Sequence, residues 1–351
     1  MTTQSEADGG TTVAALGEDG LVRGVIARYA PPPAGVLVGP GDDAAVLELP
    51  GRSVISTDTL VEGYDFLRTW SSAHDVGGKT AAQNLADVAA MGATPFALVV
   101  SLATPGDLPA VWARELADGL ADECARAGAA VGGGDVSQAG EIVVTGTAVG
   151  LLPGPAVLRS GAQVYDVVAL AGGTGPAAAG LALLQAGLGA GDSPAGDSPA
   201  GDWHAGDWHA GLVRAHLAPR PDYSAGVVAA AAGATAMIDI SDGLLRDARR
   251  VAEASGVVLD LDPAALAPAS DLLAAASALG DEGLAFGWVL SGGEDHALLA
   301  CFPPGAAVPA PFRPIGEVRA RGEAGIGTAG EAGVLLAGRP YDGNEGWRHF
   351  R

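Results

Sequence analysis

The sequence is poor in the residue types on which several classes of protein depend. It has only two cysteines in 351 residues, Cys124 and Cys301, which lie far apart in apolar surroundings. Two such residues make neither a disulfide framework nor a zinc site. The most apolar stretch, residues 225–240, is interrupted by glycine, threonine and aspartate, and it is too rich in small residues to span a bilayer. Residues 1–16 lack the basic start and apolar run of a signal peptide, so we expect a cytoplasmic protein.

Positive charge is also scarce. Lysine and arginine number 19 against 41 aspartates and glutamates, and 19 − 41 gives a net charge of −22. This balance argues against nucleic acid or an anionic membrane as a partner. It does not exclude a phosphate substrate if metal ions stand between the phosphates and the carboxylates. Solubility alone explains the total charge equally well.

Lys79 is the only lysine, and it closes a segment that looks like a phosphate-binding loop, AHDVGGKT at residues 73–80. Such a loop needs glycine where Ala73 stands and a strand before it, and residues 69–72 read TWSS instead. We therefore reject the phosphate-loop interpretation. Lys79 itself can have a specific role or be an ordinary surface residue.

Length and composition predict two domains with large cores, because 48% of the residues are hydrophobic and only 17% are charged. The expected parts are a disordered N-terminus at residues 1–16, an N-terminal domain at residues 17–152 and a C-terminal domain at residues 153–351. The boundary falls at the sequence LPGP. Helices and strands alternate without regular βαβ spacing, which predicts two mixed α/β domains.

Residues 191–210 form a tandem repeat, GDSPA twice and then GDWHA twice. Glycine, aspartate and proline at this density cannot build a core, so we expect a solvent-exposed insertion. His204 and His209 with the neighbouring aspartates are conceivable metal ligands. A short tandem duplication is the better explanation, since the loop has no scaffold to fix a coordination geometry.

Periodicity and turn residues predict most of the regular elements. The expected helices are 18–29, 72–92, 107–128, 177–186, a helix near 212, 223–232, 244–256 and 271–279. The expected strands are 44–49, 53–56, 96–102, 141–152, 164–171, 234–240, 257–261 and 295–302. Strands 44–49 and 53–56, joined by the turn Pro50-Gly51, predict a hairpin that brings Asp43 close to Asp58.

Five short motifs share one design, in which an acidic residue follows a strand or a glycine turn. They are GDD at 41–43, STD at 56–58, NLAD at 84–87, GGGD at 132–135 and DISDG at 239–243. Mg²⁺ takes oxygen ligands and keeps several waters, so single carboxylates plus substrate phosphates suit it. Glycine beside aspartate lets the backbone approach phosphate oxygens. Each motif alone is also explained as a turn or a helix cap. It is the set that predicts a site for magnesium and phosphates.

These motifs, together with GDDAAVL at 41–47, NLADVAAMGATP at 84–95 and SGGED at 291–295, resemble the thiamine-monophosphate kinase family. That family belongs to the superfamily of aminoimidazole ribonucleotide synthetase and selenophosphate synthetase. The resemblance runs from about Leu16 to Phe350, with the repeat as an addition. It implies an α/β (α+β) fold of two mixed domains whose N-terminal sheets pair in a homodimer. It also implies transfer of the γ-phosphoryl group of ATP to thiamine monophosphate, with several Mg²⁺ ions.

The resemblance further implies roles for individual residues. The metal ligands would be Asp43, Ser56, Thr57, Asp58, Asp87, Asp135, Asp239 and Asp242. ATP would contact Gly134, Asp135, Arg159 and Ser241, and thiamine monophosphate would contact Asp65, Glu294 and Trp347. No covalent intermediate or general base is expected, because the attacking phosphate oxygen is already ionised at neutral pH.

Three departures from the family pattern bear on these roles. Many relatives have histidine where Asp65 stands, and Ala86 replaces a serine or threonine. The loop GGTGPAAAGL at 172–181 lacks a common Gly-Asp/Glu-Ser pattern.

Two other functions remain as alternatives. One is another ATP-using synthetase of the superfamily, although no cysteine lies in the N-terminal glycine-rich region, as a selenophosphate synthetase would need. The other is a protein that binds divalent cations without catalysis. For Arg159 alone, a surface salt bridge is the alternative to a phosphate contact.

Overall fold

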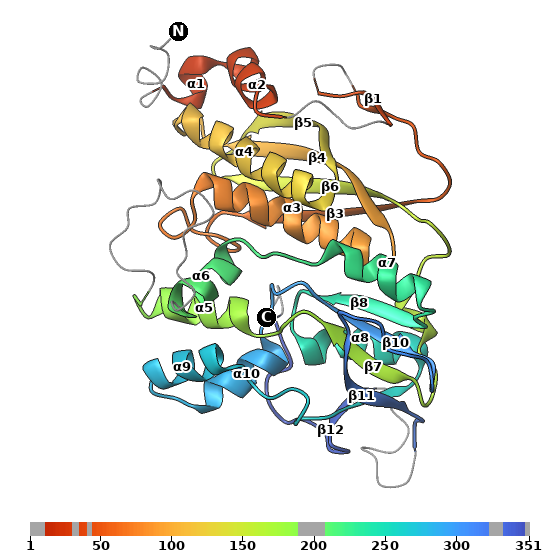
Figure 1. The fold of residues 1–351 in the computed structure, drawn as a ribbon. Helices are drawn as coiled ribbons and strands as arrows, with labels where there is room; N and C mark the ends of the chain where they lie inside the picture. The colour runs from red at the N-terminus through yellow and green to blue at the C-terminus, as the bar shows by residue number, and fades with distance from the viewer. Residues whose placement is uncertain (1–10, 30–34, 41–43, 189–207, 323–332, 348–351) are drawn as a thin grey trace. The chain divides into compact units, whose positions relative to one another are not determined.

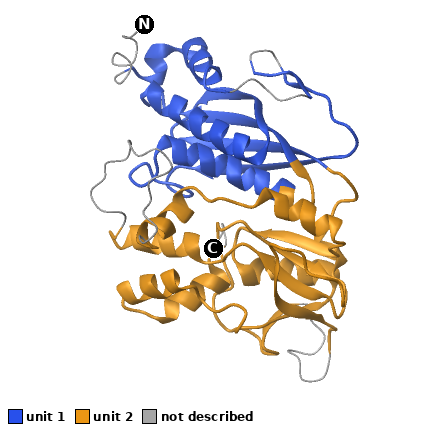
Figure 2. Cartoon of the chain, in the orientation of Figure 1, with its two compact units in different colours: residues 1–88, 95–151 blue, residues 89–94, 152–351 orange. Residues whose placement is uncertain are grey.

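The computed structural model describes residues 11–29, 35–40, 44–188, 208–322 and 333–347. The chain divides into two compact units, shown in Figure 2. Unit 1 consists of residues 1–88 and 95–151, and unit 2 of residues 89–94 and 152–351. Both units combine helices with a β-sheet, which confirms the mixed α/β fold class. In the part of the chain that the structure describes, no helix is both long and apolar enough to cross a membrane.

Unit 1 is built on a four-stranded sheet in the order β3-β6-β4-β5. The strands are β3 (Ser53–Val61), β6 (Val143–Leu151), β4 (Thr94–Thr104) and β5 (Ala130–Gln138). Helices α3 (Ala73–Ala90) and α4 (Ala110–Ala127) lie side by side across the sheet in Figure 1. Their backbones touch at Gly77 and Gly119, where a Cβ atom would collide with carbonyl groups of the other helix. The close approach therefore depends on glycine at both positions.

The hairpin predicted between residues 44–49 and 53–56 is wrong. The first of these segments forms β2 (Val46–Leu47), which pairs with β1 (Val36–Val38). The second is the beginning of β3, which continues to Val61 and pairs antiparallel with β6 over nine residues. A ladder of this length offers more backbone hydrogen bonds than the short hairpin would, so it determines the pairing. Asp43 lies outside the described residues.

The N-terminal part of unit 1 contains two short helices, α1 (Val13–Leu16) and α2 (Glu18–Ile26). We expected disorder up to residue 16, but the structure has α1 there. The Thr12 hydroxyl caps this helix by accepting a hydrogen bond from the Ala15 N–H at 3.2 Å. A threonine cap is a local signal that glycine-rich surroundings concealed.

Unit 2 contains a six-stranded sheet in the order β12-β9-β11-β7-β10-β8. The strands are β7 (Val167–Ala171), β8 (Ala236–Ile240), β9 (Val258–Leu261), β10 (Ala297–Phe302), β11 (Arg313–Arg319) and β12 (Gly333–Leu336). All neighbours are antiparallel except β12 and β9. Alternate residues enter two separate cores, so that Leu170 and Ile238 lie in one and Ala169 and Met237 in the other.

Helices cover both faces of this sheet. Residues of α7 (Tyr223–Ala231) belong to the smaller core. The larger core takes residues from α5 (Pro176–Gln185), α6 (Trp208–Leu217), α8 (Leu244–Ser255), α9 (Ser270–Ala278) and α10 (Gly283–Ser291). The last residues of the repeat, Trp208–Ala210, already belong to α6, and Ala210 is buried. This end of the expected insertion is therefore part of the packed fold, while residues 191–207 lie outside the described residues.

Candidate functional site

In unit 1, β3 and α3 are joined by hydrogen bonds at Ser56 and Asp58. The Ser56 hydroxyl donates a hydrogen bond to Asp87 Oδ2 at 2.7 Å, which joins the strand to the helix. The Asp58 N–H donates to the side-chain oxygen of Asn84 at 2.9 Å. Three of the predicted metal ligands thus lie beside one another in this unit. They stand in the middle of a strand and on a helix, whereas we expected the ends of a hairpin.

Asn84, the first residue of the NLAD motif, fixes the backbone of Asp58 to α3, although it was not among the predicted site residues. It is fully buried and also donates from its side chain to the Thr80 carbonyl oxygen at 2.9 Å. Gly146 on β6 lies opposite, and a Cβ atom there would collide with the Asn84 side chain. The signal available in the sequence is an amide one turn before Asp87, on a helix that also buries the polar side chains of Lys79, Thr80 and Gln83.

Thr57 and Asp135 do not join Ser56 and Asp87 within the chain. Thr57 lies on the opposite face of β3, where its hydroxyl donates to the Gly146 carbonyl at 2.7 Å. Asp135 lies on β5, at the other outer edge of the sheet, and accepts a hydrogen bond from the Ser137 hydroxyl at 2.8 Å. Three strand spacings of about 4.8 Å separate the two edges by about 14 Å.

Gly134 also lies on β5, within a strand that continues through the glycine run to Gln138. A Cβ atom at Gly134 would collide with the Val100 carbonyl oxygen of β4. The close approach of the two strands is therefore a structural reason for glycine at this position, independent of any nucleotide.

Asp65 and Lys79 are neighbours. Asp65 Oδ2 accepts a hydrogen bond from the Val61 N–H at 2.8 Å, and its backbone carbonyl accepts one from Lys79 Nζ at 3.2 Å. Lys79 is only 2% exposed, so of the two possibilities left open for it, a surface position is wrong. Residues 73–80 lie within α3, which confirms that they are not a phosphate-binding loop. The lysine instead stabilises the turn that carries Asp65.

In unit 2, three segments far apart in the sequence come together at the end of β8. The Glu294 N–H donates to the Ser241 carbonyl at 2.8 Å, and the Trp347 N–H donates to the Asp242 carbonyl at 2.9 Å. The His296 N–H donates to the Ile240 carbonyl at 3.0 Å. The structure therefore brings together the predicted ATP, metal and substrate residues of this unit, with Arg159 as the exception.

Asp239 carries a buried carboxylate at the centre of this group. Its Oδ2 atom has no hydrogen-bond partner among the described residues and lies 3.5 Å from His296 Nδ1. A buried oxygen left without a donor is costly unless a cation or water meets it. Asp239 therefore suits the role of a metal ligand.

Asp242 is held differently, by two arginines of α8. Its Oδ2 accepts from Arg250 Nη2 at 2.5 Å and from Arg246 Nε at 3.3 Å. A cation at Asp242 would share the carboxylate with these guanidinium groups.

The loop of Ser241 and Asp242 is positioned by Asp247, another residue that the sequence analysis did not single out. The Asp247 carboxylate is fully buried and accepts from the N–H groups of Ser241 at 3.0 Å and Asp242 at 2.9 Å. Burial raises the pKa of Asp247 to about 6, against the opposing effects of the Asp242 N–H and of Arg250. The sequence shows an aspartate in the first turn of α8, but an aspartate there is equally explained as a favourable charge near a helix N-terminus.

Glu294 and Asp295 lie side by side but face different partners. Glu294 Oε2 is 3.8 Å from Nδ1 of His216, which is buried on α6. Asp295 accepts from the N–H groups of Gly175 at 2.6 Å and Ala177 at 2.8 Å, at the start of α5. Burial of the carboxyl group raises the pKa of Asp295 to about 7, although both N–H groups act in the opposite direction. The glycine loop before α5 thus already has an internal carboxylate at its helix N-terminus.

Arg159 lies apart from this group. It begins the 3₁₀ helix η1 (Arg159–Gly161), and its carbonyl oxygen accepts from the hydroxyl of Ser255, the last residue of α8, at 2.8 Å. Ser241 and Asp242 precede the first residue of that helix. Twelve residues at 1.5 Å each place Arg159 about 18 Å away along the helix axis.

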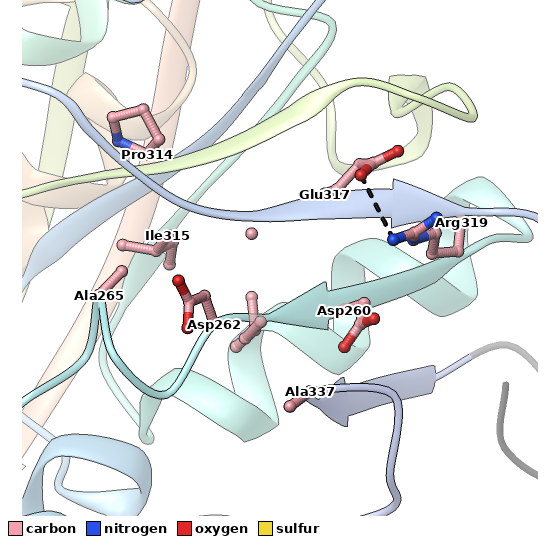
Figure 3. Close-up of a pocket in the computed structure, with 10 residues that line it drawn as sticks. Asp260, Asp262, Ala265, Pro314, Ile315, Glu317, Arg319 and Ala337 are labelled. Carbon is pink, nitrogen blue, oxygen red and sulfur yellow. Dashed lines mark ion pairs between the residues drawn. The ribbon is translucent and has the colours of Figure 1, made fainter.

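A cavity of about 390 Å³ lies elsewhere in unit 2, between β9 and β11, and Figure 3 shows its lining. Asp260, Asp262 and the ion pair of Glu317 with Arg319 (3.5 Å) border it. It contains none of the predicted site residues. Strands β7 and β10 separate it from β8, so it is not the candidate site.

The donors present suit magnesium. They are carboxylate and hydroxyl oxygens, which a hard cation prefers. Among the described residues, no three acidic, histidine or cysteine side chains are already grouped closely enough to hold a metal ion. Such dispersed carboxylates match the coordination of Mg²⁺, in which substrate phosphates and waters complete the shell.

Comparison with known proteins gives consistent matches. Residues 41–152 match the family model "AIR synthase related protein, N-terminal domain". The thiamine-monophosphate kinase of Mycobacterium tuberculosis is 46% identical over 342 residues, 97% of this chain and 93% of that protein. The crystal structure of thiamine-monophosphate kinase from Stenotrophomonas maltophilia K279a is 29% identical with a TM-score of 0.75, covering 91% of this chain and 96% of that one. AaThiL complexed with AMPPCP and TMP is 27% identical with a TM-score of 0.72, covering 95% and 97%.

Proposed function

Because the chain belongs to the thiamine-monophosphate kinase family, we propose that it transfers the γ-phosphoryl group of ATP to thiamine monophosphate. The products would be thiamine diphosphate and ADP, in the last step of thiamine diphosphate biosynthesis. The observation that carries this proposal is 46% identity to a thiamine-monophosphate kinase over 97% of the chain. AMPPCP, which is bound by AaThiL, is an analogue of ATP, which supports ATP as the phosphoryl donor.

The residues of unit 1 would bind the metal and the polyphosphate. We assign Ser56, Asp58 and Asp87 to one group of ligands, because the Ser56 hydroxyl is hydrogen-bonded to Asp87 and the Asn84 side chain fixes the backbone of Asp58 to the same helix. The proposed set of ligands is completed by Asp43, Thr57 and Asp135 of unit 1 and by Asp239 and Asp242 of unit 2. When bound, Mg²⁺ ions would neutralise the phosphates so that one polyanion can approach the other.

The residues of unit 2 would bind the nucleotide and the acceptor. Ser241 would contact ATP, together with Gly134 and Asp135 of unit 1. Glu294, Trp347 and Asp65 would orient thiamine monophosphate. Arg159, which lies about 18 Å along α8 from Ser241, would reach a different part of the nucleotide.

No side chain needs to remove a proton from the acceptor, because its phosphate oxygen is ionised at neutral pH. The proposed role of the protein is therefore to hold the two phosphates in line and to stabilise their charge.

A homodimer formed through the N-terminal sheets is part of this proposal. In a single chain Asp58 and Asp135 stand on the two outer strands of the sheet, about 14 Å apart. A second copy that places its β5 beside β3 would bring the two carboxylates closer. Ile55, which is 68% exposed on β3, would be covered by such a contact. A cytoplasmic location remains an expectation from the sequence.

The proposal is tested by comparing Asp58→Asn with the parent protein. The exchange removes ligand charge and keeps the side-chain shape, so kcat for ADP release should fall by about 100-fold or more with an unchanged circular dichroism spectrum. Asp222→Asn, at the exposed N-cap of α7, is the matched control and should keep full activity. Normal kcat for Asp58→Asn at low Mg²⁺ would show that Asp58 is not a ligand.

The same assay separates the proposal from its alternatives. A protein that only binds cations would take up Mg²⁺ without forming ADP. Another synthetase of the superfamily would consume ATP with a different substrate and would not form ADP in response to thiamine monophosphate.

A further inference from the structure

Residues 344–347 lie across the start of α8, beside the Ser241–Asp242 loop, and an ion pair ties them to the helix. We propose that the pair of Arg249 with Glu345 is a positioning element for Trp347 and thereby sets the affinity for the heteroaromatic ring of the acceptor. This inference rests on the proposed function, in which Trp347 contacts thiamine monophosphate.

The tie between the segment and the helix has three parts. Arg249 Nε donates to Glu345 Oε2 at 2.9 Å, and its Nη2 donates to Oε1, so the guanidinium makes a bidentate contact with the carboxylate. The Arg246 N–H donates to the Glu345 carbonyl at 3.1 Å. The hydrogen bonds to Glu345 raise the pKa of Arg249 further above its ordinary value. A two-pronged, charge-assisted contact restricts direction as well as distance.

The next two residues transmit this restraint to Trp347. Gly346 has a φ of 152°, and a Cβ atom there would collide with the Asp242 carbonyl oxygen. The Trp347 N–H then donates to the same oxygen at 2.9 Å. Glu345, Gly346 and Trp347 are consecutive, so a shift of Glu345 also displaces the Gly346 backbone and the Trp347 N–H from the Asp242 carbonyl oxygen.

The indole is suited to a planar cationic heterocycle. Trp347 is 49% exposed, so part of its ring surface is open to a ligand. Thiamine monophosphate carries a pyrimidine and a positively charged thiazolium ring, and both favour an aromatic face. Glu294, whose N–H binds the Ser241 carbonyl, stands on the neighbouring segment and supplies negative charge. The rings of thiamine monophosphate would lie against Trp347 and Glu294, whereas the phosphates of ATP would lie elsewhere.

The division of work among the arginines of α8 supports a separate role for this pair. Arg246 and Arg250 bind the Asp242 carboxylate, whereas the side chain of Arg249 reaches the C-terminal segment. Breaking the Arg249 pair therefore leaves the contacts of Arg246 and Arg250 with the Asp242 carboxylate in place.

Charge reversal tests the proposal. Arg249→Glu and Glu345→Arg should each raise KM for thiamine monophosphate about tenfold, equivalent to about 1.4 kcal/mol, with little change in KM for ATP. The double exchange restores opposite charges and should recover most of the affinity. Glu345→Gln, the mildest change, should show the same selectivity with a smaller effect. Arg319→Glu, which breaks the ion pair with Glu317 in Figure 3, is the matched control and should leave both KM values unchanged.

Two results would overturn the proposal. One is unchanged KM for thiamine monophosphate in all three single variants at Arg249 and Glu345. The other is a parallel loss for both substrates that the double exchange does not recover, which would indicate a purely structural ion pair.

A second measurement is independent of catalysis. Hydrogen exchange of the C-terminal peptide should be faster in Arg249→Glu, because the Trp347 N–H loses its restraint. If the parent protein forms no ADP, the proposed function fails. If exchange in the variant is unchanged, the positioning role of the pair fails on its own.

Discussion

At the contact of α5 with α6, the structure determines whether a glycine-to-alanine exchange raises or lowers the free energy of unfolding. At Gly180 the two helices touch through their backbones, and a Cβ atom there would collide with the Leu212 carbonyl oxygen. Gly211, on α6 itself, has no atom within 4 Å of the corresponding Cβ position. The same exchange, glycine to alanine, therefore meets opposite surroundings on two helices that pack together.

The expected magnitudes come from two opposing effects. Alanine in place of glycine inside a helix stabilises by up to about 1 kcal/mol. Forcing an atom into a packed contact costs about 1 to 3 kcal/mol. Gly180→Ala should therefore lower the free energy of unfolding by about 1 to 2 kcal/mol, since the backbone carbonyl cannot turn aside. Gly211→Ala should raise it by about 0.5 to 1 kcal/mol.

Urea unfolding followed by circular dichroism measures both variants, provided that the dependence on urea is the same as in the parent protein. A second readout is KM for thiamine monophosphate, because α6 carries His216 to within 3.8 Å of Glu294. Gly180→Ala should separate the helices and raise this KM. Gly211→Ala should leave the helices in contact and the KM unchanged. Equal or greater stability of Gly180→Ala would refute the described contact.

Three further predictions concern other parts of the chain. The pKa of Asp295 is raised to about 7 from an ordinary value near 4, so its contribution to stability is present below about pH 4 and is lost as the pH rises through 7. Between pH 5 and pH 8 this titration lowers the free energy of unfolding by at most about 2.6 kcal/mol, and partial exposure of the residue reduces the effect to about 1 to 2 kcal/mol. Urea unfolding of Asp295→Asn should lack this part of the pH dependence. A variant that retains it would contradict the raised pKa of Asp295. Asn84→Ala leaves the Asp58 N–H without its side-chain acceptor and should cost about 2 to 3 kcal/mol together with most of the activity; a fully active variant would show that Asn84 does not position Asp58. Removing residues 191–200, the two GDSPA copies, should leave ADP release nearly unchanged, and a large loss would give the repeat a role in function.

Local signals predicted many of the elements because each has its own periodicity or cap. Helix α4 ends at Gly128 with a φ of 72°, and α8 ends at Gly256 with a φ of 70°, as glycine after an amphipathic run predicts. Elements without such a signal were missed. Helix α10 is apolar all round, and β11 and β12 lie among proline and glycine, where neither period is visible.

In the candidate site, too, some residues could be predicted from the sequence and others could not. Acidic residues beside glycine could be recognised singly, and the DISDG segment does meet Glu294 and Trp347 in unit 2. The residues that position them could not be recognised, because Asn84 and His216 contact residues distant in the sequence and Asp247 reaches back to the loop before its own helix. The hairpin failed for a related reason, since the longer partner of β3 is β6, about 90 residues later in the chain.

The most direct measurement is a quantitative assay of both products, ADP and thiamine diphosphate, after incubating the purified protein with ATP, Mg²⁺ and thiamine monophosphate. The two products should form in equal amounts, and free thiamine in place of the monophosphate should give neither. ADP that forms at the same rate without thiamine monophosphate, or no ADP at all, would contradict this prediction.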